Sequence, residues 1–132
     1  MTKVVLDTNV LVSALLSNGP PAVITDLVAE GKLTLFYNDE IIGEYWDVLR
    51  RKKFKFRSSQ VSRLIDTIVK AGIAVMDTLL SVIPMPDEND RKFYDVAKVS
   101  SAFLITGNLK HFPQEPFIVN SSDFLKLYLL ND

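Results

Sequence analysis

The chain has 132 residues, 48% of them hydrophobic and 23% charged, which is the composition of an ordinary globular domain and not of a disordered, fibrous or membrane protein. One domain covering residues 1–132 is expected, because a chain of this length can bury a core without covalent cross-links. The sequence has no cysteine and one histidine, which excludes a disulfide framework, a thiolate zinc site and a histidine-rich metal site. The formal net charge is −1, so the molecule as a whole neither attracts nor repels a polyanion strongly.

The sequence indicates neither a signal peptide nor a membrane span. Lys3 and Asp7 interrupt the apolar residues at the amino end. No apolar run approaches the ~20 residues that a membrane-spanning helix needs. We therefore expect a cytoplasmic protein with no membrane partner.

Short apolar runs alternate with segments of helical periodicity along the chain. In chain order, the expected elements are a strand at 3–6, a helix over 10–16, a helix from Pro20 or Pro21 to about Glu30, a strand at 33–37, a helix capped by Asn38 or Asp39 that carries Glu44, a helix capped by Ser58 or Ser59 that ends before Gly72, a strand at 73–76, a helix opened by Asp90, strands at 102–105 and 117–119, and a helix from Ser121 or Ser122 to about Leu130. This alternation predicts a parallel sheet covered on both faces, because parallel strands need crossover connections that are usually helical. Ligands of such folds bind beyond the carboxyl ends of the strands, so the residues that follow each strand are the first candidates for a site.

Three acidic positions are candidates for a shared site. Asp7 follows the first strand, Asp90 begins the helix before the fourth strand, and Glu44 is the acid on a helix face of apolar and aromatic residues. Each position alone has an ordinary explanation: a turn or cap residue for Asp7, a half-exposed helix acid for Glu44, and a solvated acidic turn with a helix cap for Asp87 and Asp90. A shared metal ion explains them together. Oxygen ligands without cysteine or histidine are those that Mg²⁺ or Mn²⁺ prefers.

A basic segment, residues 50–57, interleaves six cations with two phenylalanines. Seven of the 15 basic residues lie between Arg50 and Arg63, where there is no acid. The segment is either a solvated helix end, where cations complement the helix dipole, or an arm that contacts phosphates. Lys110 is a further candidate for phosphate contact, whereas His111 is expected to form a structural hydrogen bond.

These candidates lie in four motifs that resemble those of the PIN-domain nucleases, and especially the small bacterial VapC-like toxins of toxin–antitoxin pairs. The motifs are VVLDTNV at residues 4–10, EIIGEY at 40–45, PDENDRKF at 86–93 and FLITGNLKHF at 103–112. Each motif alone is a weak signal, but four in this order over nearly the whole chain are a strong one. The resemblance implies a three-layer α/β/α fold with a central, mainly parallel sheet of about five strands.

The resemblance also implies a function, which is metal-dependent hydrolysis of RNA phosphodiesters by an endoribonuclease that uses Mg²⁺ or Mn²⁺. Asp7, Glu44 and Asp90 are then the catalytic acids and metal ligands. Asn108 stands where many family members have a fourth acid, and its amide oxygen is expected to be a further ligand of the ion or to hold a water. An amide brings no negative charge, so we expect a single tightly held ion at rest. An antitoxin protein and a second copy of the chain, in a homodimer, are the implied protein partners.

Other residues are expected to support the ligands or to bind RNA. Those expected around the ligands are Asn9, Asp87, Asp95 and Thr106. Asp95 lies on a different helix face from Asp90, so it is the poorer candidate for direct metal binding. Those expected to contact RNA are Arg50, Arg51, Lys53 and Lys110.

Two other functions compete with this interpretation. A phosphatase of the haloacid-dehalogenase kind also begins with an apolar strand that ends in an aspartate, but it needs a second aspartate where this chain has Asn9. A PIN-fold module that binds RNA or protein without cleaving is the other alternative, and it is motivated by Asn108. Retention of Asp7, Glu44 and Asp90 favours the nuclease.

Overall fold

Five short strands form one parallel sheet in the computed structural model, which describes residues 1–76 and 80–130. The strands are β1 (Lys3–Leu6), β2 (Thr34–Tyr37), β3 (Ile73–Ala74), β4 (Phe103–Ile105) and β5 (Ile118–Val119). Their order in the sheet is β3-β2-β1-β4-β5, and every neighbouring pair is parallel. The predicted parallel sheet of about five strands is therefore confirmed.

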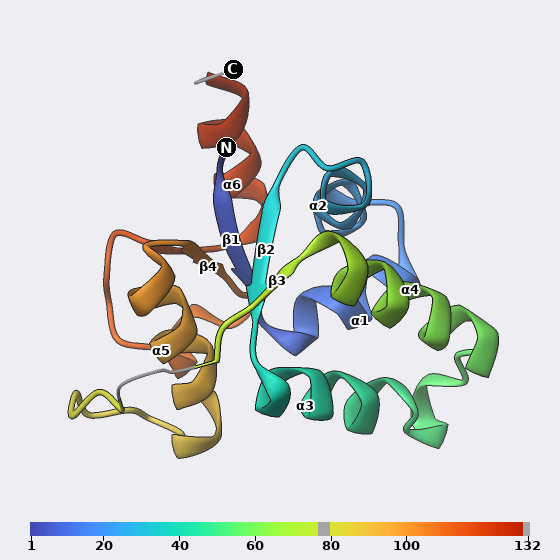
Figure 1. Cartoon of the computed structure of the whole chain (residues 1–132), viewed down its shortest axis with the longest axis horizontal. Coiled ribbons are helices and arrows are strands. Elements are labelled where there is room, and N and C mark those ends of the chain that lie inside the picture. Colours follow the sequence, from blue (N-terminus) through green and yellow to red (C-terminus); the bar gives the residue numbers. More distant parts are fainter. Residues whose placement is uncertain (77–79, 131–132) are drawn as a thin grey trace.

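Helices cover both faces of the sheet. They are α1 (Thr8–Leu16), α2 (Pro20–Ala29), α3 (Asp39–Leu49), α4 (Ser58–Ala71), α5 (Arg91–Ser100) and α6 (Ser121–Leu130), with short 3₁₀ turns η1 (Lys52–Phe54), η2 (Glu88–Asp90) and η3 (Leu109–His111). Figure 1 shows α5 on one side of the strands and α1, α2, α3 and α4 on the other. This arrangement confirms the three-layer α/β/α architecture.

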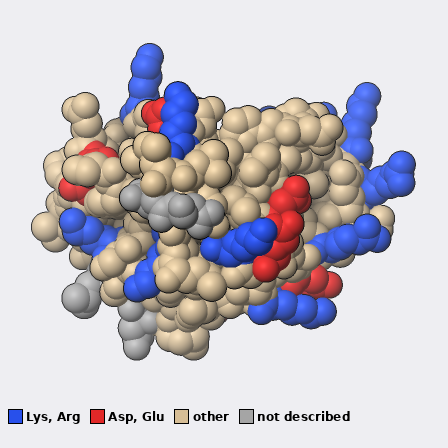
Figure 2. Space-filling view, turned by 90° about the horizontal axis from the view of Figure 1, so that it is seen from above, with Lys and Arg blue, Asp and Glu red and all other residues tan. Residues whose placement is uncertain are grey.

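The central strand β1 is buried on both of its faces, as expected for a parallel sheet between two helical layers. Val4, Val5 and Leu6 are fully buried, and the largest buried side chains of the core are Tyr45, Phe93 and Phe124. Basic and acidic side chains are interspersed on the face shown in Figure 2, as a net charge near zero would lead one to expect.

The direction in which successive strands are added to the sheet reverses between β1 and β4. From β1 it proceeds outward to β2 and β3 on one side, and it then returns to place β4 on the other side of β1. The carboxyl ends of β1 and β4 therefore flank the topological switch point, where ligands of open parallel sheets bind. Asp7 follows one of these strands, and Thr106 follows the other.

Most predicted element boundaries agree with the structure. Asn38 caps α3 as predicted, with its Oδ1 accepting from the Ile41 N–H at 2.9 Å. The first helix begins at Thr8, two residues before the predicted start at Val10.

Two predicted details are wrong. Neither Ser58 nor Ser59 caps α4, because Arg57 occupies the N-cap position and its N–H is 3.4 Å from the accepting Oε1 of Gln60. The strand predicted at residues 73–76 pairs only over Ile73–Ala74, because both residues are exposed at the outer edge of the sheet and little burial favours a longer pairing. Beyond them, the Val75 N–H donates to the Tyr37 carbonyl at 2.7 Å.

No single helix in the described part of the chain is long and apolar enough to cross a membrane. The consecutive helices α1 and α2 reach the required length and apolar composition only together, and they are bent by 103° at the break between them.

Gly72 permits the end of α4 to approach β2, which yields a stability prediction. A Cβ at this position would lie 2.7 Å from the Leu35 carbonyl oxygen and 2.9 Å from a ring carbon of Tyr37. Gly72→Ala should therefore lower the free energy of unfolding by about 1–3 kcal/mol through overpacking. Urea denaturation measures this change.

Gly43 provides the matched control, because it is exposed within α3 and a Cβ there would meet no atom within 4 Å. Gly43→Ala should raise the free energy of unfolding by about 0.5–1 kcal/mol, since alanine favours a helix interior. Equal effects of the two substitutions would show that α4 does not depend on this close approach.

Candidate active site

Asp7 is held at the switch point by the strand next to its own. Its N–H donates to the Ile105 carbonyl at 2.9 Å, which continues the pairing of β1 with β4 by one residue. Its Oδ2 accepts from Thr106 Oγ1 at 2.7 Å and from Asn9 Nδ2 at 3.2 Å. The residue is 6% exposed, so this carboxylate is both buried and fixed in orientation.

The turn after β4 forms hydrogen bonds with the two residues that hold the Asp7 carboxylate, Asn9 and Thr106. The Gly107 N–H donates to Asn9 Oδ1 at 3.0 Å, and the Asn108 N–H donates to Thr106 Oγ1 at 3.0 Å. Asn9 and Thr106 thus each bond both to Asp7 and to this turn. These hydrogen bonds fix the Asp7 carboxylate relative to the turn after β4.

Glu44 reaches the site from the middle of α3. The neighbouring Tyr45 is fully buried, and its hydroxyl donates to the Leu6 carbonyl at 2.6 Å, which anchors α3 to the end of β1. One oxygen of Glu44, Oε2, accepts a hydrogen bond from Thr8 Oγ1. The other, Oε1, lies 2.8 Å from the Nζ of Lys92, whose side chain is 13% exposed.

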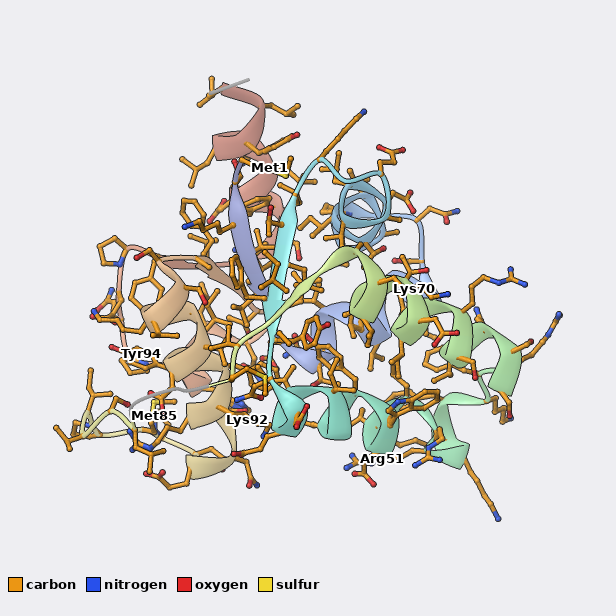
Figure 3. The ribbon with its side chains drawn as sticks, in the orientation of Figure 1. Met1, Arg51, Lys70, Met85, Lys92 and Tyr94 are labelled. Atoms are coloured by element: carbon orange, nitrogen blue, oxygen red, sulfur yellow. The ribbon has the colours of Figure 1, made fainter. Side chains whose placement is uncertain are left out.

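Lys92 therefore places a positive charge beside the Glu44 carboxylate, which is one of the three predicted acids. It belongs to the first turn of α5, and Figure 3 shows it between that helix and the start of α3. Its Nζ also donates to the Asn89 carbonyl and lies 5.2 Å from the centre of the Phe93 ring. Glu44 can lie among apolar neighbours because it accepts a hydrogen bond from the Thr8 hydroxyl and forms a half-buried ion pair with Lys92.

Asp90 carries a carboxylate oxygen that receives no hydrogen bond. Its Oδ2 is buried and has no hydrogen-bond partner among the described residues. Burial is the largest of the causes that together raise the pKa of Asp90 to about 6. The negative charges of Asp7 and Asp87 act in the same direction, and His111 acts against them. Buried polar atoms are nearly always paired, so an unpaired carboxylate oxygen indicates a place that a cation or donor would fill.

The three predicted acids influence one another electrostatically. The pKa of Asp7 is raised by burial, an effect that the Thr106 hydrogen bond opposes and the charge of Glu44 strengthens. The charges of Asp7 and Glu44 also contribute to the raised pKa of Asp90. The structure thus places Asp7, Glu44 and Asp90, from the end of β1, α3 and the start of α5, within electrostatic reach of one another.

Asp7, Glu44 and Asp90 do not form a complete metal site in the structure. Among residues 1–76 and 80–130, no three His, Asp or Glu side chains are placed so that they could bind one ion jointly. The chemistry of these acids nonetheless fits a hard divalent cation, because Asp90 Oδ2 receives no hydrogen bond and the charges of Asp7, Asp87 and Glu44 act on this carboxylate. Mg²⁺ usually binds through one or two carboxylates and keeps several waters, so it does not need a full set of protein ligands.

Other predicted residues lie around this group or away from it. Asp87 is exposed and caps η2 by accepting from the Asn89 N–H at 2.9 Å, yet its charge acts on Asp90. Asp95 is buried, and its Oδ1 accepts from the Ser81 N–H at 3.3 Å, so its described hydrogen bond leads away from the other acids. The Asn108 side chain contacts His111, with Nδ2 and Nε2 3.1 Å apart.

The predicted RNA contacts are all exposed. Arg51 pairs with Asp47 at 3.2 Å, Arg50 lies over the Trp46 ring, and Lys53 lies over the Phe54 ring. Such exposed contacts are worth about 1 kcal/mol or less, so they leave these cations available to a ligand. Lys110 is in η3, next to Asn108 and His111 in the chain.

Sequence reasoning missed two residues that contact Glu44, namely Thr8 and Lys92. Thr8 directly follows Asp7 in the first motif, which is the signal that could have identified it. Lys92 follows Asp90 by two residues, but a lysine in the first turn of a helix says nothing about which carboxylate it will meet. Only the packing of α5 against α3 decides that contact.

Comparison with known proteins agrees with this geometry. A PIN domain family model matches residues 3–110. An uncharacterized protein of Methanocaldococcus jannaschii is 32% identical over 109 residues, a match that covers 80% of this chain and 70% of that protein. No solved structure matches the chain significantly.

The raised pKa of Asp90 predicts how the stability of the metal-free protein, measured in EDTA, changes with pH. The pKa of this carboxyl is about 6 when folded and about 3.9 when unfolded, so the unfolded state loses its proton first as pH rises. The stabilisation from the protonated carboxyl is complete below pH ~4 and is lost between about pH 4 and 6.

Asp90→Asn removes this titration. Relative to the native chain, the variant should gain about 1–2 kcal/mol of unfolding free energy between pH 4 and pH 7, after allowance for solvent screening. Urea denaturation at several pH values measures the difference. A difference that does not change with pH would contradict a buried, repelled carboxylate at position 90.

Proposed function

Because this chain belongs to the PIN-domain family, whose fold is of the nuclease type, we propose that it is a metal-dependent endoribonuclease that hydrolyses RNA phosphodiesters. The observation that carries the proposal is the buried, unpaired Oδ2 of Asp90, which lies among the charges of Asp7 and Glu44 at the switch point of the sheet. The proposed cofactor is Mg²⁺ or Mn²⁺.

The chain's own residues divide the work of such a site. Asp7 and Asp90 would hold the ion, Asp7 in the orientation that Thr106 and Asn9 give it. A bound divalent ion activates a water and polarises the scissile phosphate. Glu44 would orient the attacking water, while Thr8 keeps its carboxylate in place.

Lys92 has a second role in this proposal. Its ammonium group neutralises one carboxylate of the site before any ion binds. A phosphodiester is negatively charged, so this charge lowers the repulsion that the acids would exert on an approaching RNA. Lys92 thus makes it possible for an acidic site to accept a polyanion.

A catalytically weakened binding module is the second candidate. Two observations favour it: Lys92 occupies an oxygen of Glu44, and the acids are not placed to bind an ion jointly. The haloacid-dehalogenase alternative loses its basis with membership of the PIN family. Asn9, at the position where that enzyme class needs an aspartate, instead supports Asp7 and Gly107.

The resemblance to VapC-like toxins carries three further parts of the proposal. These are a role as the toxin of a toxin–antitoxin pair, a homodimeric state and a cytoplasmic location. An antitoxin segment that inserts into the acidic site would silence the nuclease by excluding RNA.

RNA cleavage by the purified chain tests the proposed activity. With Mn²⁺ or Mg²⁺, the native chain should cleave single-stranded or structured RNA, and EDTA should abolish cleavage. Asp7→Asn should reduce the rate by at least ~10³-fold, because it removes the charge that binds the ion and leaves the amide in the same place. Gel analysis of labelled RNA fragments measures the rate.

Asp66→Asn is the matched control, since Asp66 is an exposed carboxylate of α4. It should cleave at the native rate. If the native chain binds RNA but leaves it intact across both metals, the binding module replaces the nuclease.

The basic segment gives a separate prediction about RNA affinity. Reversing the charge at Arg50, Arg51 and Lys53 should weaken RNA binding and flatten its salt dependence. The slope of log affinity against log salt should fall by about 2 if all three contact phosphates of single-stranded RNA. Fluorescence anisotropy over a salt series measures the slope.

Reversal of Lys32, Lys70 and Lys126, which are exposed on other parts of the surface, is the control and should leave the slope nearly unchanged. If the slope is also unchanged after reversal in the basic segment, that segment is a solvated helix end.

A further inference from the structure

His111 lies at the unpaired oxygen of Asp90. Its Nδ1 is 3.7 Å from Asp90 Oδ2, the buried oxygen that has no hydrogen-bond partner in the described part of the chain. This separation is too long for a hydrogen bond, which spans about 2.7–3.2 Å. The two atoms face each other with a gap that neither fills.

The gap is wide enough for a shared metal ion. Two ligand atoms that each lie about 2.1 Å from one ion are about 3.0 Å apart at a right angle and about 4.2 Å apart in line. The observed 3.7 Å corresponds to an angle of about 120° at such an ion, so the half-exposed His111 ring would shift by less than about 1 Å to reach the right angle of an octahedral site. A cation between the two atoms would also satisfy the oxygen that the protein leaves unpaired.

The other ring nitrogen of His111 lies against the Asn108 amide nitrogen, and this amide becomes the partner that a metal-binding imidazole needs once it is turned over. A metal-binding histidine usually donates its second N–H to an oxygen, which fixes the ring orientation. The Asn108 amide lies 3.1 Å from His111 Nε2, and a half-turn of that amide presents its oxygen to the N–H. Asn108 then acts on the ion through His111, as a positioning residue.

We infer that Asp90 Oδ2 and His111 Nδ1 bind the same divalent ion, and that the site consequently prefers Mn²⁺ or a later first-row metal to Mg²⁺. This inference rests on the proposed metal-dependent function and names the class of metal. An imidazole nitrogen strengthens binding of the transition metals, whereas Mg²⁺ gains little from a nitrogen ligand. Water and substrate oxygens complete the coordination shell.

Spin-echo modulation spectroscopy of the Mn²⁺-loaded, tag-free full chain tests the inference. The method detects a nitrogen nucleus that is bound directly to Mn²⁺. His111 is the only histidine of the sequence, so a nitrogen signal in the native chain has one imidazole source. The signal should be present in the native chain and absent from His111→Asn, which offers an amide oxygen in its place.

Calorimetric titration provides the second readout. His111→Asn should lose about tenfold or more in Mn²⁺ affinity and much less in Mg²⁺ affinity, so the ratio of Mn²⁺ affinity to Mg²⁺ affinity should fall. Asn108→Ala should weaken Mn²⁺ binding in the same direction while the nitrogen signal persists. Lys126→Gln, on the surface of α6, is the control and should retain both affinities.

The outcomes separate this inference from the proposed function. If Mn²⁺ binds without a nitrogen signal, or if the signal survives in His111→Asn, then His111 is not a ligand and the proposed nuclease stands. If Mn²⁺ does not bind the native chain at all, both fail. Circular dichroism of each variant shows whether it folds.

Discussion

Burial of like charges at the carboxyl edge of the sheet is the constraint around which the neighbouring contacts are arranged. The ionised carboxylates of Asp7 and Asp90 would both be more stable in water, because burial disfavours the charged form and so raises the pKa of each. The fold offsets part of this cost with hydroxyl donors, from Thr106 to Asp7 and from Thr8 to Glu44. Asp90 Oδ2 receives no such donor, and it is there that a ligand has the most free energy to contribute.

The rest of the fold makes such a concentration of charge tolerable. β1 and β4 are central strands that lie side by side, and the Tyr45 hydroxyl ties α3 to the last residue of β1. Because these supports come from the fully buried core, Asp7 and α3 cannot separate without disturbing packing that stabilises the whole chain. Rigid supports of this kind convert electrostatic repulsion into affinity for a cation.

Negative charge remains in excess at the site. Asp7, Glu44 and Asp90 carry three negative charges when ionised, and Lys92 beside Glu44 supplies one positive charge. Asp87, whose charge also acts on Asp90, adds to this excess. Asn108, where a fourth acid would stand by family resemblance, adds no charge and instead contacts His111.

The sequence by itself determined the sheet, the helices and a set of acids that act on one another electrostatically near the switch point. It could do so because apolar runs and helical periodicity are local signals, and because parallel topology brings strand ends such as Asp7 and Thr106 to one edge. Local signals failed at two places. They predicted a serine as the N-cap of α4, where the structure has Arg57, and they predicted a longer β3, which is shortened by its exposure at the edge of the sheet. Only the tertiary structure decided which partners the acids find. Lys92 meets Glu44, and His111 faces Asp90, because helix packing and the path of the loop after β4 set those distances, and no spacing along the chain encodes them.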